Sequence, residues 1–262
     1  MDITPIIFDD SSRKSLITFD PPEDYKGSGP IPIIKLLKDA ALSECFFVSP
    51  NFHSYVKALK LCDKHKIQLH FGLELWVTDD AARLDESSRL NESKIIVWQV
   101  NSAGYHDLIK LYNAFQAAID EGTGKSKYFY YHMRYDWKGV KQHWGDNLML
   151  SLPSWDSFLA RNTLNYGSQI VPDMPVKPVL FREIDTGHPQ EQLINMAIDR
   201  FNVADNHEVI NTKSVYYAGP EDFKSYMVDR CIHNRSKFSN PNLEFMCSDQ
   251  FSWKSYLTLR GT

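Results

Sequence analysis

Three side chains in this sequence have types and positions that could bind a metal ion. Asp9, His53 and Glu74 each come shortly after a short apolar run. Carboxylates and imidazoles are common protein ligands for Mg²⁺, Mn²⁺ and Zn²⁺. In a metal-dependent phosphoesterase, several such ligands converge on the ion, which activates a water and stabilises the leaving oxygen. A reduced site built from Asp9, Glu74 and His53 would therefore suit a phosphoesterase that uses Mn²⁺, Zn²⁺ or Mg²⁺.

The elements that must position these residues are short apolar runs, which alternate with segments of helical periodicity. The predicted strands are 5–8, 45–48, 68–71, 94–100, 147–150, 176–181 and 208–210. Strands that alternate with helices favour parallel βαβ units, and the length of the chain suits a (β/α) barrel. Chemistry in such a barrel lies at the carboxyl ends of the strands. These ends carry mostly hydroxyls, amides and one proline here, although the strand at 176–181 would also present Glu183 or Asp185.

Three segments of the sequence resemble one known family. They are Gly72-Leu73-Glu74, the stretch Asn-Ser-Ala-Gly-Tyr-His-Asp-Leu-Ile-Lys-Leu-Tyr at 101–112, and the stretch Asn-Thr-Lys-Ser-Val-Tyr-Tyr-Ala-Gly-Pro-Glu-Asp at 211–222. In this order they resemble segments of the PHP domain (polymerase and histidinol phosphatase) of C-family replicative DNA polymerases, the bacterial polymerase III alpha type. The resemblance covers nearly the whole chain and implies a distorted TIM-like (β/α)7-type PHP barrel.

Most metal ligands of that family are replaced in this chain. The acid of its Gly-Leu-Glu motif is retained as Glu74, and its opening His-x-His falls on Asp9 and Ser11. The histidine that opens its fourth strand is matched by Lys94, which would place a cation where the family binds a metal. The remaining replaced positions are Ser49 in the Thr-Asp-His-Gly loop, Pro153 in the Ser-Gly-Cys corner, and Ser214 and Tyr216 in the closing Asp-x-His. Asp9 and Glu74 are then the residual ligand-capable residues, and we expect no metal and no catalytic residues.

The resemblance implies a free-standing, degenerate PHP module, that is, a pseudoenzyme. In the polymerases this domain supports the catalytic core and offers a docking surface to the proofreading exonuclease. We therefore expect the chain to act by protein–protein contacts in DNA replication, with a polymerase or a proofreading exonuclease as its partner, and it could be virus-encoded. The alternative is a metal-dependent phosphoesterase or nuclease with a reduced site around Asp9 and Glu74.

A separate group of residues could bind single-stranded nucleic acid or a partner. Cations and aromatic residues interleave in the group Lys125, Lys127, Tyr128, Tyr130 and Arg134. Such a patch can stack bases while its cations contact phosphates. The other interpretation is that the aromatic residues pack a loop or a partner, and the acidic balance of the chain favours it. Directly after this group, Asp136 is expected to cap a helix N-terminus.

The overall composition limits the class of protein. With 262 residues, 43% of them hydrophobic, the chain fits a single PHP-like domain over 1–262 with a short helical C-terminal extension from about 236. A formal net charge of −4 gives no general attraction to nucleic acid. No signal peptide or membrane span is apparent, so we expect a cytoplasmic protein, in the host cytoplasm if it is viral. The four widely spaced cysteines are expected to be reduced and mostly buried.

Overall fold

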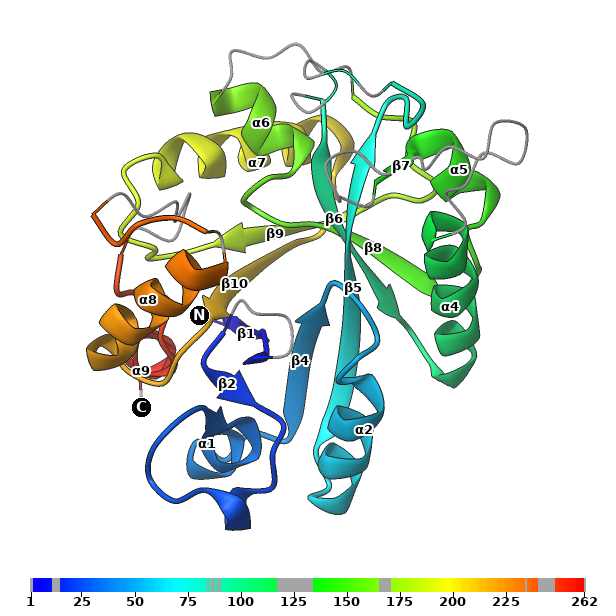
Figure 1. Ribbon diagram of the computed structural model, residues 1–262. Helices are drawn as coiled ribbons and strands as arrows, with labels where there is room; N and C mark the ends of the chain where they lie inside the picture. Colours follow the sequence, from blue (N-terminus) through cyan, green and yellow to red (C-terminus); the bar gives the residue numbers. More distant parts are fainter. Residues whose placement is uncertain are drawn as a thin grey trace. The chain divides into compact units, whose positions relative to one another are not determined.

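The computed structural model describes residues 2–10, 15–83, 85, 88, 91–116, 134–164, 171–233, 235–239 and 248–261. Helices and strands alternate along most of these ranges, so the mixed α/β class is confirmed (Figure 1). The chain forms two compact units. The first consists of Met1–Gly72, Glu183–Gln192 and Ile210–Thr262, and the second of Leu73–Arg182 and Leu193–Val209.

In the described part of the first unit, three strands pair in parallel. The central strand β1 (Thr4–Ile7) lies between β4 (Glu44–Ser49) and β10 (Val209–Val215), and Ile7 pairs with Phe47 on one side and Val215 on the other. Both Ile6 and Ile7 are buried, as expected for a parallel strand that is covered on both faces. A small parallel pair, β2 (Ile17–Thr18) and β3 (Ile31–Pro32), accompanies this sheet.

The helices of the first unit are short. They are the 3₁₀ turns η2 (Pro22–Asp24) and η3 (Pro220–Asp222) and the α-helices α1 (Ile33–Asp39), α2 (Tyr55–Lys64), α8 (Phe223–His233) and α9 (Trp253–Arg260). Ser252 caps the N-terminus of α9, because its hydroxyl accepts a hydrogen bond from the Ser255 amide. Gly261 caps the C-terminus with a φ of 83°, the left-handed conformation that glycine adopts without strain.

The second unit contains most of the remaining strands. They are the greater part of β5 (Gln68–Thr78), together with β6 (Ser93–Gln99), β7 (Tyr135–Asp136), β8 (Leu148–Leu152) and β9 (Val179–Glu183). The pairs β5–β7 and β8–β9 are parallel, whereas β6 and β8 are antiparallel, with Val97 opposite Leu150.

The antiparallel pair corrects the prediction of uniformly parallel βαβ units. The chain enters β8 at the end where β6 leaves, because the Val100 amide donates to the Asn147 carbonyl at 3.0 Å. An apolar run shows that a segment is buried, but it does not encode the direction in which the strand runs. The sequence pattern therefore could not separate a parallel from an antiparallel neighbour here.

Among the residues that the structure describes, four helices belong wholly or mainly to the second unit. They are α4 (Ser102–Gln116), α5 (Trp137–Gln142), α6 (Phe158–Leu164) and α7 (Glu191–Asp205). Helix α4 packs against β6 and β8, and α6 packs against β6 (Figure 1). The predicted cap of α5 is confirmed, because the Asp136 carboxylate accepts a hydrogen bond from the Gly139 amide at 2.7 Å.

The structure also bears on the predictions about the cysteines and about membrane-spanning helices. Cys45, Cys62 and Cys231 are free, buried thiols, as predicted, while Cys247 lies outside the described residues. None of the helices in the described ranges is both long and apolar enough to cross a membrane.

Candidate functional site

Glu74, the retained acid of the resemblance, lies inside a strand rather than at its carboxyl end. The predicted strand stopped at 71, whereas β5 continues to Thr78 because nearly every side chain after Gly72 is buried. This longer strand corrects the prediction that Glu74 follows a strand. Side chains two positions apart in a strand project from the same face, so Glu74 and Trp76 lie on one side of β5.

Lys94 forms ion pairs with the Glu74 carboxylate and with a second acid, Asp156, in the same unit. Lys94 is the second residue of β6, and its Nζ lies 3.1 Å from Asp156 Oδ2 and 3.7 Å from Glu74 Oε2. The backbones of the two residues are also hydrogen-bonded, since the Lys94 amide donates to the Asp156 carbonyl at 2.8 Å. Asp156 stands in the turn before α6 and has a φ of 61°, which lies in the left-handed region of backbone conformation.

An indole ring completes this group. Lys94 Nζ lies 5.1 Å and the Arg161 guanidinium carbon 5.3 Å from the centre of the Trp76 ring, within the range of cation–π attraction. Arg161, on α6, also lies 3.7 Å from Asp156 Oδ1. We call these five residues (Glu74, Trp76, Lys94, Asp156 and Arg161) the Lys94 cluster.

The charges of the Lys94 cluster balance. Its two cations and two carboxylates sum to zero, and the side chains are largely buried, from 4% exposed for Glu74 to 21% for Arg161. An ammonium satisfies a carboxylate electrostatically, but it has no coordination position and cannot activate a water as a metal does. The residues around Glu74 therefore do not fit a divalent cation, because a lysine already provides the positive charge.

The predicted positions of the first unit lie around the carboxyl ends of its strands. Asp9 is 1% exposed and stands two residues beyond β1, and Ser49 is the buried last residue of β4. Tyr216 stacks on Phe8 with ring centres 4.7 Å apart. Ser11 lies outside the described residues.

Two further predicted site residues, His53 and Pro153, are not placed as metal ligands. His53 is exposed in the turn before α2, where its backbone amide donates to Asn51 Oδ1 at 2.9 Å. Pro153 follows β8 directly and is half-buried. Within the described residues, no group of three or more His, Cys, Asp or Glu side chains is arranged to hold a metal ion.

Ser214 pairs with an acid that the resemblance did not assign. Glu183, the last residue of β9, accepts hydrogen bonds from the Ser214 amide and, at 2.8 Å, from the Ser214 hydroxyl. Burial raises the pKa of the Glu183 carboxyl to about 7, against the lowering effects of the Ser214 hydrogen bonds and of Lys213. Burial also lowers the pKa of Lys213, whose Nζ donates to the Ile184 and Asp185 carbonyls.

Arg134 corrects part of the predicted nucleic-acid or partner patch. Its side chain is fully buried, and Nη1 donates to Glu92 Oε1 at 3.0 Å and to Ser88 Oγ at 2.8 Å, while Nη2 donates to the Arg83 carbonyl. A guanidinium held in this way is not presented to a phosphate. The other members of the patch, Lys125, Lys127, Tyr128 and Tyr130, lie outside the described residues.

The sequence did not single out Trp76, Asp156 or Arg161. Each is an ordinary residue of a strand, a turn or a helix in the sequence, and they meet only because β5, β6 and the turn before α6 come together. The one signal for the cluster was Lys94, at a position where the resemblance expected a metal ligand.

No protein-family model matches the chain, and no curated protein matches it. The PHP resemblance therefore depends on the sequence motifs alone.

Proposed function

We propose that this chain is a non-catalytic PHP-like module that acts by protein–protein contacts in DNA replication. The proposal includes the finer fold assignment, a distorted (β/α)7-type barrel within the α/β class. The three motifs at 72–74, 101–112 and 211–222 support the PHP-like fold. The Lys94 cluster supports the absence of catalysis.

The observation that carries the proposal is the pair of contacts from the Lys94 ammonium to Asp156 and Glu74. The position matched by Lys94 is a metal-binding histidine in the family that the sequence resembles. A lysine there supplies a fixed single charge, so it can stabilise the buried carboxylates without binding substrate oxygens or producing hydroxide. A protein that keeps the helices and strands of a fold but replaces its metal-binding residues keeps its binding surfaces and loses its catalytic activity.

The partner follows from the resemblance and not from the site. The domain in the polymerases contacts its own polymerase core and the proofreading exonuclease, so the proposed partner is a DNA polymerase or a 3′–5′ exonuclease. A virus-encoded replication protein fits this interpretation. Direct binding to single-stranded nucleic acid is the weaker expectation, since the net charge is −4 and Arg134 is buried.

Two measurements test the proposal together. Affinity purification from the source cells should return a DNA polymerase or a proofreading exonuclease, and the purified pair should bind directly in a titration. The same preparation should not hydrolyse a nucleoside phosphodiester in Mn²⁺, Zn²⁺ or Mg²⁺. Metal-dependent hydrolysis that disappears in Glu74→Gln would contradict the proposal and establish the phosphoesterase alternative.

A further inference from the structure

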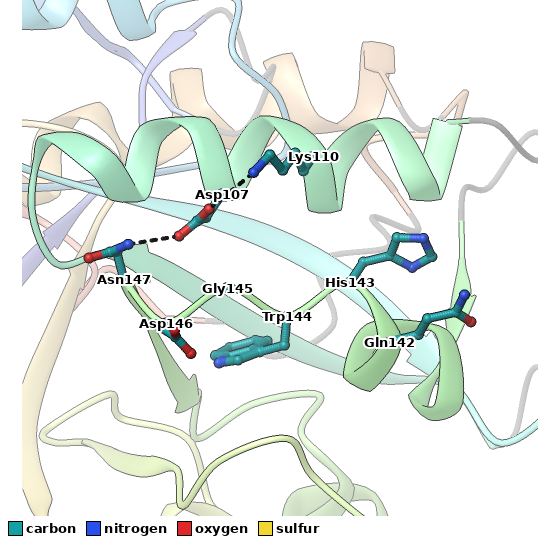
Figure 2. Close-up of a pocket in the computed structure, with 8 residues that line it drawn as sticks. All are labelled: Asp107, Lys110, Gln142, His143, Trp144, Gly145, Asp146 and Asn147. Carbon is teal, nitrogen blue, oxygen red and sulfur yellow. Dashed lines mark hydrogen bonds and ion pairs between the residues drawn. The ribbon is translucent and has the colours of Figure 1, made fainter.

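The surface of the second unit carries a polar pocket and, separately, an apolar helix face. The pocket has a volume of about 430 Å³ and lies between α4 and the segment 142–147 (Figure 2). Its Asp107 carboxylate already has partners, because Oδ2 accepts from Asn147 Nδ2 at 3.0 Å and Oδ1 lies 3.8 Å from Lys110 Nζ. The apolar face lies on α7 and is exposed to solvent, so its burial by a second surface would be favourable.

One face of α7 packs into the second unit. Ile194 and Ile198 are almost completely buried, and Phe201 packs edge-to-face on Phe158 of α6 with ring centres 5.5 Å apart (Figure 1). Phe201 also stacks on the His207 ring, with ring centres 4.6 Å apart. These contacts fix which side of the helix faces the interior, and therefore which side faces solvent.

The opposite face of α7 is apolar as well. Leu193, Met196 and Val203 are 53%, 45% and 84% exposed, and the exposed Arg200 lies between the last two. The four residues follow the spacing i, i+3, i+7 and i+10, which places them in one line along the helix. We call this set (Leu193, Met196, Arg200 and Val203) the α7 stripe. A surface helix normally carries polar residues on the face away from the core, so a continuous apolar stripe there indicates an interaction surface.

The α7 stripe has the spacing of a helix that pairs with a second helix. Positions i, i+3, i+7 and i+10 are the a and d positions of a coiled coil, which pack against the same positions of a partner helix. If two copies of α7 run antiparallel, with a two-fold axis level with Ile198, Leu193 lies opposite Val203 of the second copy. In the same arrangement Met196 lies opposite Arg200. Each residue of the stripe therefore has a counterpart in the stripe of the other copy.

The same arrangement pairs the charge of Arg200. Asp199, the preceding residue, has a side chain that is 56% exposed, although Arg182 of β9 contacts its carboxylate. In the antiparallel pair, Arg200 of each copy lies about 4.5 Å along the helix axis from the level of Asp199 of the other copy. The arginine stem can pack on Met196 while its guanidinium donates to this carboxylate. The stripe and its flank are thus complementary to a second copy in both apolar surface and charge.

We propose that the α7 stripe is a self-association surface, at which two copies of this chain pair their α7 helices antiparallel about a two-fold axis. A contact that uses the same patch on both copies closes on itself, so it gives a dimer and not a fibre. The stripe is about 15 Å long, and a single helix face of this length buries less than the roughly 800 Å² per partner of a standard interface. We therefore expect a weak dimer, with a dissociation constant on the order of 100 μM.

Sedimentation equilibrium of the full-length protein, in a concentration series that reaches about 1 mM, tests the dimer. We expect Leu193→Glu and Val203→Glu each to weaken association by about tenfold or more, because each places a carboxylate in the apolar contact. Val228→Glu is the matched control, since it changes an exposed valine of α8 in the first unit and should leave association unchanged. All three positions are exposed, so the variants should fold, and their melting curves check this.

A mixture of two variants tests the antiparallel register. Leu193→Glu and Val203→Lys should each weaken their own dimer, but in the mixture the introduced glutamate of one copy lies opposite the introduced lysine of the other. The mixture should therefore associate about tenfold more tightly than either variant alone. A mixture of Leu193→Glu and Met196→Lys is the control and should show no such recovery, because its introduced charges do not lie opposite one another.

Three results would overturn the proposed pairing. They are a chain that stays monomeric up to about 1 mM, a dimer that Leu193→Glu weakens no more than Val228→Glu does, and a mixture of Leu193→Glu and Val203→Lys that does not recover association. None of these results depends on whether a replication protein binds the chain, so the self-association surface and the proposed function can fail separately.

Discussion

At the scale of single residues, the Lys94 ammonium and two buried carboxylates depend on one another. Glu74 and Asp156 have side chains that are 4% and 9% exposed, so water does little to stabilise their charges. Removing one partner of a buried ion pair leaves an uncompensated charge, and this loss costs far more than the intact pair contributes. The Lys94 side chain is itself 17% exposed, so screening by solvent is small.

We therefore predict that Lys94→Met destabilises the protein strongly at neutral pH. The free energy of unfolding should fall by about 3 kcal/mol. Urea denaturation at neutral pH measures this change. Lys35→Met is the matched control, because it breaks the exposed Lys35–Asp39 pair and should cost less than about 1 kcal/mol. Equal losses in the two variants would show that the Lys94 contacts do not stabilise the fold.

Glu183 predicts a distinct dependence of stability on pH. Burial raises its pKa from 4.5 to about 7, so the folded state holds the proton more tightly than the unfolded state. Its stabilising contribution is complete below pH 4.5 and is lost as the pH rises through about 7. A shift of this size corresponds to roughly 3 kcal/mol.

Glu183→Gln should accordingly flatten the fall in unfolding free energy between mildly acid and neutral pH. The amide keeps the shape of the side chain and does not titrate, so the comparison isolates the proton. Denaturant titrations across this pH range provide the measurement, with the exposed Glu208→Gln as the control. A wild-type slope that persists in Glu183→Gln would assign the effect to another group.

At the scale of elements, the capping aspartate of α5 offers the clearest prediction. The Asp136 carboxylate satisfies the Gly139 amide, one of the donors that a helix N-terminus leaves without a partner in the helix. Asp136→Ala should lower the free energy of unfolding by about 1 kcal/mol, and Asp136→Asn should lower it much less, because asparagine also caps. Thermal or urea unfolding of both variants tests this. Similar losses for alanine and asparagine would mean that the cap does not act through the side-chain oxygen.

The elements that could be predicted from sequence are those with a local signal. The Asp136 cap is visible as an aspartate directly before a helical pattern, and apolar runs locate β1, β4 and β6 to within one residue of their bounds. The runs did not show that β5 extends to Thr78, because Glu74 interrupts the apolar pattern although it is buried. Its burial depends on Lys94, which lies in another strand, so no local pattern could reveal it.

The same limit applies to the candidate sites. The resemblance directed attention to Lys94 and Glu74, but Asp156 joins them through a left-handed turn that carries no marked sequence signal. Arg134 shows the opposite case, in which a cation among aromatic residues suggested a surface, yet Glu92 and Ser88 hold it in the interior. Charge in a sequence predicts exposure only when no buried acid is available to pair with it.

At the scale of the whole molecule, the proposed function requires that the folded chain gains nothing from a divalent ion. A metal that binds only the folded state raises its melting temperature, and an ion at ~100 times its dissociation constant would add roughly 2.7 kcal/mol. For a chain of this size, that free energy corresponds to several degrees. The Lys94 cluster predicts no such gain at Glu74.

The most direct test is a thermal-melting series of the purified protein in EDTA, Mn²⁺, Zn²⁺ and Mg²⁺, with metal analysis of the same preparation. We predict the same melting temperature in all four conditions and no bound metal. A rise of several degrees in Mn²⁺ or Zn²⁺ that is absent in Glu74→Gln would contradict the account, because it would show that Glu74 binds a metal ion despite Lys94.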